Sequence, residues 1–151
     1  MAKILLLSGP NLNLLGEREP DHYGTTTLAE LVALASETAA KLGHEVEHVQ
    51  SNHEGALIDA IHGARGECAA IVINAGAFTH YAYAITDALA MFEGVKIEVH
   101  LSNPYAREQW RHRSVVAPVV DGTITGLRAE GYRLAIEAVA ARLAERTGAG
   151  S

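Results

Sequence analysis

The stretch that decides the fold is the opening run Lys3-Ile4-Leu5-Leu6-Leu7-Ser8-Gly9-Pro10-Asn11-Leu12-Asn13-Leu14-Leu15-Gly16-Glu17-Arg18. It starts with an apolar segment of strand length, which is followed at once by the turn-forming pair Gly9-Pro10. Continuous apolar strands are typical of parallel sheets that helices cover on both faces. In such sheets, ligands bind beyond the carboxyl ends of the strands. The polar segment from Asn11 through Arg18 to Tyr23 is therefore the first place to look for a functional site.

The composition is that of a globular protein. The chain has 151 residues, of which 48% are hydrophobic and 20% charged, and this length suffices to bury a sizeable core. The formal net charge of −6 argues against nucleic-acid binding, which requires a basic surface, and against an anionic membrane surface. The N-terminus lacks the apolar core of a signal peptide, and no apolar run approaches the ~20 residues of a membrane helix. We expect a cytoplasmic protein with a single domain over residues 1–151, of which residues 147–151 form a disordered tail.

Neither a disulfide framework nor a metal site is indicated. The single Cys68 fits a reducing compartment, and its place before an apolar run predicts a buried, unreactive thiol rather than a nucleophile. No residues have the spacing of metal ligands. Four scattered histidines are expected at solvated or helix-capping positions: His22, His44, His48 and His53.

Strand-like and helical segments alternate along the chain. Strands are expected over residues 4–7, 45–49, 69–74 and 95–100, with a short fifth strand supplied by residues 115–120 and 122–124. Helices are expected over residues 28–42, 54–63, 83–92 and 127–144. Thr27 and Glu30 form a capping box, Gly43 ends the first helix, and residues 51–54 offer a second cap. The apolar arc of the last helix is wider than one sheet face requires, so this helix either lies deep between elements or buries a subunit contact.

This alternation predicts an α/β fold. Strand–helix–strand units have right-handed crossovers, which produce a parallel, doubly wound sheet. For five strands we expect the flavodoxin-like order 2-1-3-4-5, with helices on both faces. The second strand alternates polar and apolar residues and should lie nearer an edge.

Three strand ends should meet at one edge of this sheet, carrying residues 8–13, 74–80 and 100–111. The glycine-rich phosphate motifs and the G-x-S-x-G elbow of hydrolases are absent. What remains is proton transfer on a polar anion, with His80, His100, Tyr23 and arginines as candidates. Three arginines fall within seven residues, at 107, 111 and 113. Their spacing fits a small anionic ligand and a solvated loop equally well.

Five blocks of sequence resemble the type II 3-dehydroquinate dehydratases, in the order and spacing of that family: Ser8–Gly16, Arg18–Gly24, Asn74–His80, Glu98–Asn103 and Arg107–Arg111. The resemblance spans about residues 3–146 and implies a flavodoxin-like fold. It implies reversible dehydration of 3-dehydroquinate to 3-dehydroshikimate, by anti elimination through an enolate, in the shikimate pathway. The family uses no metal, cofactor or Schiff base, and commonly assembles as a dodecamer of four trimers.

The resemblance also implies catalytic roles. Tyr23 would be the base, and Arg18, on the same loop, would supply a positive charge that favours its phenolate form. Asn11 would stabilise the enolate by hydrogen bonding without neutralising the base. His100 would protonate the departing hydroxyl. Glu98 precedes it by two residues, so both side chains lie on one side of the strand, and Glu98 can orient His100.

Further residues would hold the substrate: Asn74, Leu101 and Ser102 at its carboxylate and a nearby hydroxyl, and His80 and Arg111 at its ring hydroxyls. Asp87 matches a residue that reaches a neighbouring subunit's site. Arg107 resembles a residue of a lid, or one that supports the binding residues without touching the ligand, and Arg113 is expected at the surface. Four positions depart from the commonest family pattern, none of them catalytic: Ala77, Ala82, Thr86 and Trp110.

A second hypothesis is a non-catalytic flavodoxin-like module that binds a small carboxylate or phosphate. A protein that only binds has no need of Tyr23, Arg18 and His100 together, and this combination separates the two hypotheses.

Overall fold

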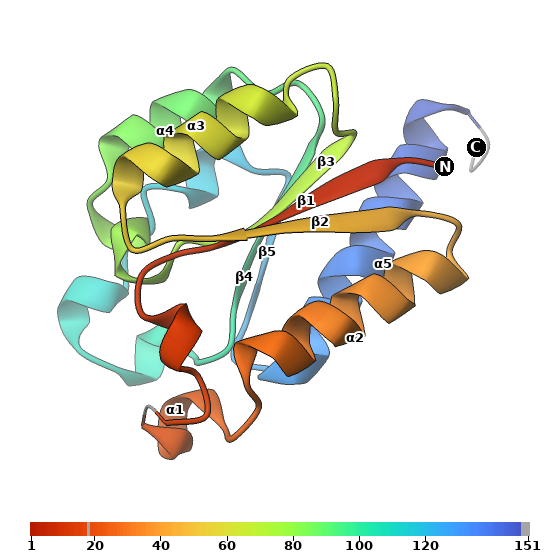
Figure 1. Cartoon of the computed structure of the whole chain (residues 1–151). Coiled ribbons are helices and arrows are strands. Elements are labelled where there is room, and N and C mark those ends of the chain that lie inside the picture. The colour runs from red at the N-terminus through yellow and green to blue at the C-terminus, as the bar shows by residue number, and fades with distance from the viewer. Residues whose placement is uncertain (18, 149–151) are drawn as a thin grey trace.

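A five-stranded sheet between two layers of helices forms the centre of the molecule (Figure 1). The computed structural model describes residues 1–17 and 19–148. The strands are β1 (Lys3–Ser8), β2 (Glu45–Gln50), β3 (Ala70–Asn74), β4 (Val95–His100) and β5 (Gly122–Thr125). All neighbouring strands are parallel and their order is β2-β1-β3-β4-β5, which confirms the expected flavodoxin-like topology. The alternating second strand lies at an edge, as expected.

The helices are α1 (Pro20–Tyr23), α2 (Leu28–Lys41), α3 (Glu54–Ala64), α4 (Tyr83–Ala90) and α5 (Ala129–Arg146). Figure 1 shows α2 and α5 on one face of the sheet and α3 and α4 on the other. None of these helices, in the part of the chain that is described, has both the length and the apolar character needed to cross a bilayer.

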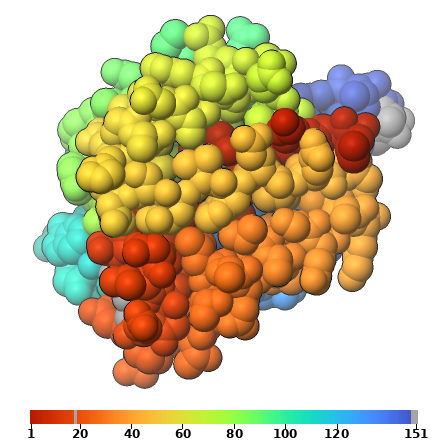
Figure 2. Space-filling model, in the orientation of Figure 1, coloured from red at the N-terminus to blue at the C-terminus, as the bar shows by residue number. Residues whose placement is uncertain are grey.

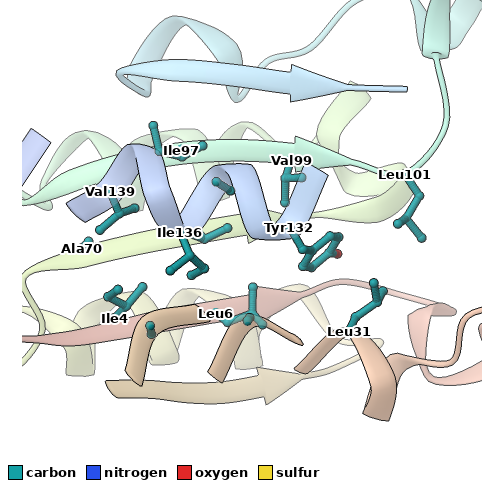
Figure 3. Close-up of a cluster of buried hydrophobic side chains, with 14 of the residues drawn as sticks. Ile4, Leu6, Leu31, Ala70, Ile97, Val99, Leu101, Tyr132, Ile136 and Val139 are labelled. Atoms are coloured by element: carbon teal, nitrogen blue, oxygen red, sulfur yellow. The ribbon is translucent and has the colours of Figure 1, made fainter. Parts of the chain in front are cut away.

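Each face of β1 supplies one of two hydrophobic cores. Ile4 and Leu6 pack in the cluster that contains residues of α2 and α5, while Leu5 and Leu7 pack in the cluster of α3 and α4. Figure 3 shows the first cluster, in which side chains of the sheet meet those of both helices, Tyr132 among them. Successive side chains of a strand point to opposite faces of the sheet. A strand that is buried on both faces therefore needs a continuous apolar run.

Local sequence signals set the ends of the first long helix. The Thr27 side chain accepts a hydrogen bond from the backbone N–H of Glu30, and the Glu30 carboxylate accepts a hydrogen bond from the backbone N–H of Thr27. The expected capping box is therefore present. Gly43 follows the end of α2 with a φ of +82°, a conformation that glycine adopts without strain. The second expected cap is different: His53 stands at the N-cap of α3 without a side-chain hydrogen bond.

The structure corrects the expected fifth strand. Residues 115–120 form no strand but contain a short 3-10 helix, Ala117–Val119, and β5 starts only at Gly122. Pro118 has no N–H to give to a strand partner, and the Ser114 side chain binds the N–H groups of Val116 and Ala117. These local interactions outweigh the β propensity of the valines.

Several helix boundaries also differ from expectation by one or two residues. Helix α4 ends at Ala90 rather than at residue 92, and α5 begins at Ala129 because Arg128 has a non-helical φ of +53°. Of the expected tail, Thr147 and Gly148 follow α5, and residues 149–151 lie outside the described residues.

Candidate active site

A cavity of about 130 Å³ lies at the carboxyl ends of β1, β3 and β4, which are neighbours in the sheet. Eight of the predicted site residues line it: Asn11, Tyr23, Asn74, His80, His100, Leu101, Ser102 and Arg111. Figure 2 shows the N-terminal loop, in red, against the cyan surface of the segment that follows β4. The sheet order therefore brings together the three loops that the sequence indicated.

Three predicted residues are not part of this lining. Glu98 lies beside it, in contact with His100. Asp87 is exposed on α4 and does not reach the cavity of its own chain. Arg18 lies outside the described residues.

The turn after β1 is shaped by close backbone packing. A Cβ atom on Gly9 would lie 2.3 Å from the carbonyl oxygen of Ala75, so only glycine allows the ends of β1 and β3 to approach this closely. Asn11 has a φ of +68°, which asparagine tolerates better than most residues. Its N–H donates to Oδ1 of Asn52 over 3.0 Å, and Gln50 donates to the same Oδ1 over 3.2 Å. The backbone at Asn11 is thus held by the loop after β2.

Tyr23, at the end of α1, is paired with an arginine from the loop after β4. Nη1 of Arg107 donates to the Tyr23 hydroxyl over 2.7 Å, and the guanidinium lies 4.9 Å from the centre of the ring. The same Nη1 lies 3.2 Å from Oγ of Ser102, and Nη2 binds Glu19 over 3.3 Å. The contact places a permanent positive charge at the Tyr23 oxygen.

Arg107 supports Tyr23 from the wall of the cavity. Its side chain is only 4% exposed, and it lines the cavity in direct contact with Tyr23. The cluster of three arginines was the sequence signal for it, but that pattern could not distinguish Arg107 from its neighbours. Arg113 is exposed, as expected.

His100 and Glu98 form a close pair at the end of β4. Nε2 of His100 lies 2.6 Å from Oε2 of Glu98, whose carboxylate is buried with a residue exposure of 2%. Two-residue spacing on a strand puts both side chains on one face, so the contact expected from alternation is present.

Asn74 is oriented by a residue that the sequence did not indicate. Its Nδ2 donates to the hydroxyl of Tyr132 over 3.1 Å, and its Oδ1 accepts from the N–H of Gly76 over 3.1 Å. Tyr132 is completely buried in α5, and burial raises its pKa to about 12, so its hydroxyl stays protonated at neutral pH. The apolar spacing of the last helix marks Tyr132 as a core position but does not reveal its polar partner.

His80 and Arg111 meet around Trp110. Nδ1 of His80 lies 2.7 Å from the carbonyl oxygen of Arg113, which can only accept, so this nitrogen carries the hydrogen. Burial lowers the pKa of His80, although the hydrogen bond to Arg113 acts in the opposite direction. The His80 ring meets the edge of Trp110, and the Arg111 guanidinium lies 4.0 Å from the centre of the Trp110 ring. Arg111 also donates to Glu108.

Other candidate residues lie apart from the cavity. Within residues 1–17 and 19–148, no group of three or more His, Cys, Asp or Glu side chains could hold a metal ion. Cys68 is half-buried rather than buried, and desolvation is the main cause that raises the pKa of its thiol. His48 differs from the expected solvated position: it is half-buried and shares a 2.9 Å hydrogen bond with Ser8.

Comparisons with known proteins agree with this arrangement. Residues 2–140 match the family described as Dehydroquinase class II. A 3-dehydroquinate dehydratase from Bacillus licheniformis is 57% identical over 136 residues, which cover 90% of this chain and 94% of that protein. The crystal structure of type II dehydroquinase from Propionibacterium acnes matches with a TM-score of 0.89 and 46% identity, covering 93% of this chain and 97% of that one. A type II dehydroquinase structure from Butyrivibrio crossotus has a TM-score of 0.89 and 49% identity, over 91% and 97% of the two chains.

Proposed function

Because the chain belongs to the class II dehydroquinase family, we propose that it is a 3-dehydroquinate dehydratase, a hydro-lyase of the shikimate pathway that converts 3-dehydroquinate reversibly to 3-dehydroshikimate. One observation carries the proposal. Two groups line the same cavity. The Tyr23 hydroxyl lies beside the Arg107 guanidinium, and His100 is held by Glu98. Loss of water from a hydroxy ketone needs both a base and an acid, and this cavity offers one of each.

In the first step, the Tyr23 phenolate removes a proton from the carbon next to the substrate ketone. The electron pair of the broken C–H bond moves into the ring and leaves an enolate, whose negative charge is on the former ketone oxygen. The 2.7 Å contact with Arg107 supports this role, since it puts a guanidinium at the oxygen that would take the proton. Arg18 remains a predicted second cation, and its test is the substitution Arg18→Ala.

In the second step, the enolate collapses and the bond between carbon and the departing hydroxyl breaks. His100 gives this hydroxyl a proton, so that it leaves as water. Asn11 would donate a hydrogen bond to the enolate oxygen, and its place in the cavity lining supports this assignment. The Glu98 carboxylate would compensate the charge of the imidazolium.

The remaining lining residues would bind the substrate. Asn74, Leu101 and Ser102 come from the ends of two adjacent strands, which supports a common site for the substrate carboxylate. His80 and Arg111 would contact the ring hydroxyls, and their shared packing against Trp110 would keep the two side chains in place.

The test is a direct assay of the purified protein. On addition of 3-dehydroquinate, we expect the ultraviolet absorbance of the conjugated enone product to rise, with and without a chelator. Tyr23→Phe should bind the substrate but lose turnover. If the folded wild-type protein binds quinate-like acids and yields no product, the dehydratase proposal fails and the non-catalytic binding module takes its place.

We also propose that the protein acts as a trimer-based dodecamer. Asp87 is exposed on α4 and away from its own cavity, which supports a contact with the site of a neighbouring subunit. Light scattering should then report about twelve times the 16.0 kDa mass of one chain, and a monomer would exclude this assembly. A cytoplasmic location is part of the same proposal and is supported by the single, unpaired Cys68.

A further inference from the structure

One hydroxyl group contacts the pair of Glu98 and His100 from outside the cavity lining. Oγ of Ser114 donates to Oε2 of Glu98 over 2.9 Å. This is the same carboxylate oxygen that lies 2.6 Å from Nε2 of His100. Ser114 comes 16 residues after Glu98, beyond the arginine-rich loop, and its position in the sequence does not indicate a role.

The direction of the hydrogen bond from Ser114 is determined by its other partners. The N–H groups of Val116 and Ala117 donate to Oγ over 3.1 Å and 2.9 Å. A serine hydroxyl has one hydrogen to donate and two lone pairs that accept. Because the two N–H groups occupy both lone pairs, Oγ of Ser114 contacts Glu98 through its hydrogen.

The segment that carries Ser114 is held independently of this pair. The N–H of Val115 donates to the carbonyl of Thr79 over 2.8 Å, and Oγ1 of Thr86 donates to the carbonyl of Val115 over 2.8 Å. These contacts tie the segment to the loop after β3 and to α4. Ser114 therefore imposes a position on Glu98, rather than following it.

The Glu98 carboxylate is held through one of its oxygens. Its Oε1 is buried and has no hydrogen-bond partner among the described residues, so Ser114 and His100 both act on Oε2. When Oε2 accepts from both Ser114 and His100, the hydrogen of the His100 contact is on Nε2. The other ring nitrogen, Nδ1, is then the atom that exchanges a proton.

We propose that Ser114 is a positioning residue for the proton donor: by donating to Glu98, it fixes the tautomer and the orientation of His100. This role rests on the dehydratase function proposed above. Ser114 does not line the cavity, so its loss should affect proton transfer and leave substrate binding largely intact.

The kinetic test compares Ser114→Ala with two further variants. We expect Ser114→Ala to lower kcat about tenfold and to change KM less than about twofold. Ser114→Thr, which retains the hydroxyl, should recover most of the lost kcat. Ser36→Ala, on α2 and outside the cavity lining, should behave like the wild type. A wild-type kcat in folded Ser114→Ala would overturn the proposal.

A second test needs no turnover and therefore separates this proposal from the function on which it rests. In protein with ¹⁵N-labelled histidine, the ring signals of His100, assigned with His100→Gln, should show hydrogen on Nε2 in the wild type. Ser114→Ala should shift them towards a mixture of tautomers. Ring signals that stay unchanged would refute the positioning role, whether or not the wild type dehydrates 3-dehydroquinate. If Ser114→Ala does not fold, Ser114→Cys takes its place, since it keeps the size of the side chain while weakening donation. Its His100 ring signals are then compared with those of the wild type in the same way.

Discussion

Nη1 of Arg107 donates a 2.7 Å hydrogen bond to the hydroxyl of Tyr23, a residue 84 positions earlier in the chain. The bond joins the loop after β4 to the end of α1, and both residues line the cavity. Because the Arg107 side chain is 4% exposed, water screens its charge weakly at this contact.

Loss of this cation should therefore impair proton abstraction. We expect Arg107→Gln to lower kcat about a hundredfold, which corresponds to about 3 kcal/mol for a charge-assisted hydrogen bond. Steady-state kinetics with 3-dehydroquinate measure the effect. The matched control is Arg133→Gln, since Arg133 contacts Glu130 and Glu137 on the surface of α5. Equal kcat values for the two variants would contradict a role of Arg107 at Tyr23.

Tyr132 should make the protein less stable in alkali. Its pKa of about 12 in the folded state lies above the ordinary value of about 10, so the folded protein binds the phenolic proton more tightly than the unfolded chain. The resulting stability is fully present below about pH 10 and is lost as pH rises towards about 12, by about 3 kcal/mol in total.

Tyr132→Phe removes this titrating group. Urea unfolding over the alkaline range should show a flatter pH dependence for Tyr132→Phe than for the wild type. At neutral pH the variant should be about 1–3 kcal/mol less stable, since the Nδ2 group of Asn74 loses its acceptor in a buried place. Tyr83→Phe, at a position that is 62% exposed, should reproduce the wild-type profile. Parallel curves for wild type and Tyr132→Phe would argue against this origin of alkaline instability.

A methyl group at Gly9 should disrupt the end of β1. The new Cβ would lie 2.3 Å from the carbonyl oxygen of Ala75, and a backbone atom cannot move aside as a side chain can. We expect Gly9→Ala to lower the free energy of unfolding by about 3 kcal/mol and to reduce activity, since Asn11 follows two residues later.

Gly63→Ala is the matched control for this substitution. Gly63 is in α3, and nothing lies within 4 Å of the added Cβ. Alanine favours the helix, so this variant should be more stable by about 0.5–1 kcal/mol. Urea unfolding measures both changes, and an equal loss in the two variants would show that the close approach at Gly9 is not the cause.

The capping box of α2 should contribute measurably to stability. Thr27→Ala removes the oxygen that accepts from the N–H of Glu30, and should cost about 1 kcal/mol in the free energy of unfolding. Thr27→Ser keeps this oxygen and should remain within about 0.5 kcal/mol of the wild type. If both variants lose stability to the same extent, the cap is not the source of the effect.

Local patterns were sufficient where the chemistry is local. The apolar run of β1, the alternation of β2 and the capping box at Thr27 each depend on neighbours a few residues apart, and each is present in the structure. The pattern failed at residues 115–120, where valines indicated a strand. There the polar contacts of Ser114 and the missing N–H of Pro118 turn the chain instead.

The sequence by itself determined the order of the strands and the edge at which the site forms. Apolar periodicity and right-handed connections allow few topologies, and parallel strands bring their carboxyl ends together. It also indicated the contact of Glu98 with His100, since alternation along one strand is a local property.

Only the tertiary structure decided which polar groups support these residues. Arg107 and Tyr23 are 84 positions apart in the sequence, and Tyr132 and Asn74 are 58 positions apart. Ser114 and Glu98 are separated by an irregular loop. Such contacts depend on how loops pack over the ends of the strands, and the apolar periodicity of the sequence does not indicate this packing. The physical reason is that hydrophobic patterning is repeated over many residues, whereas each of these hydrogen bonds depends on a single pair of atoms brought together by the fold.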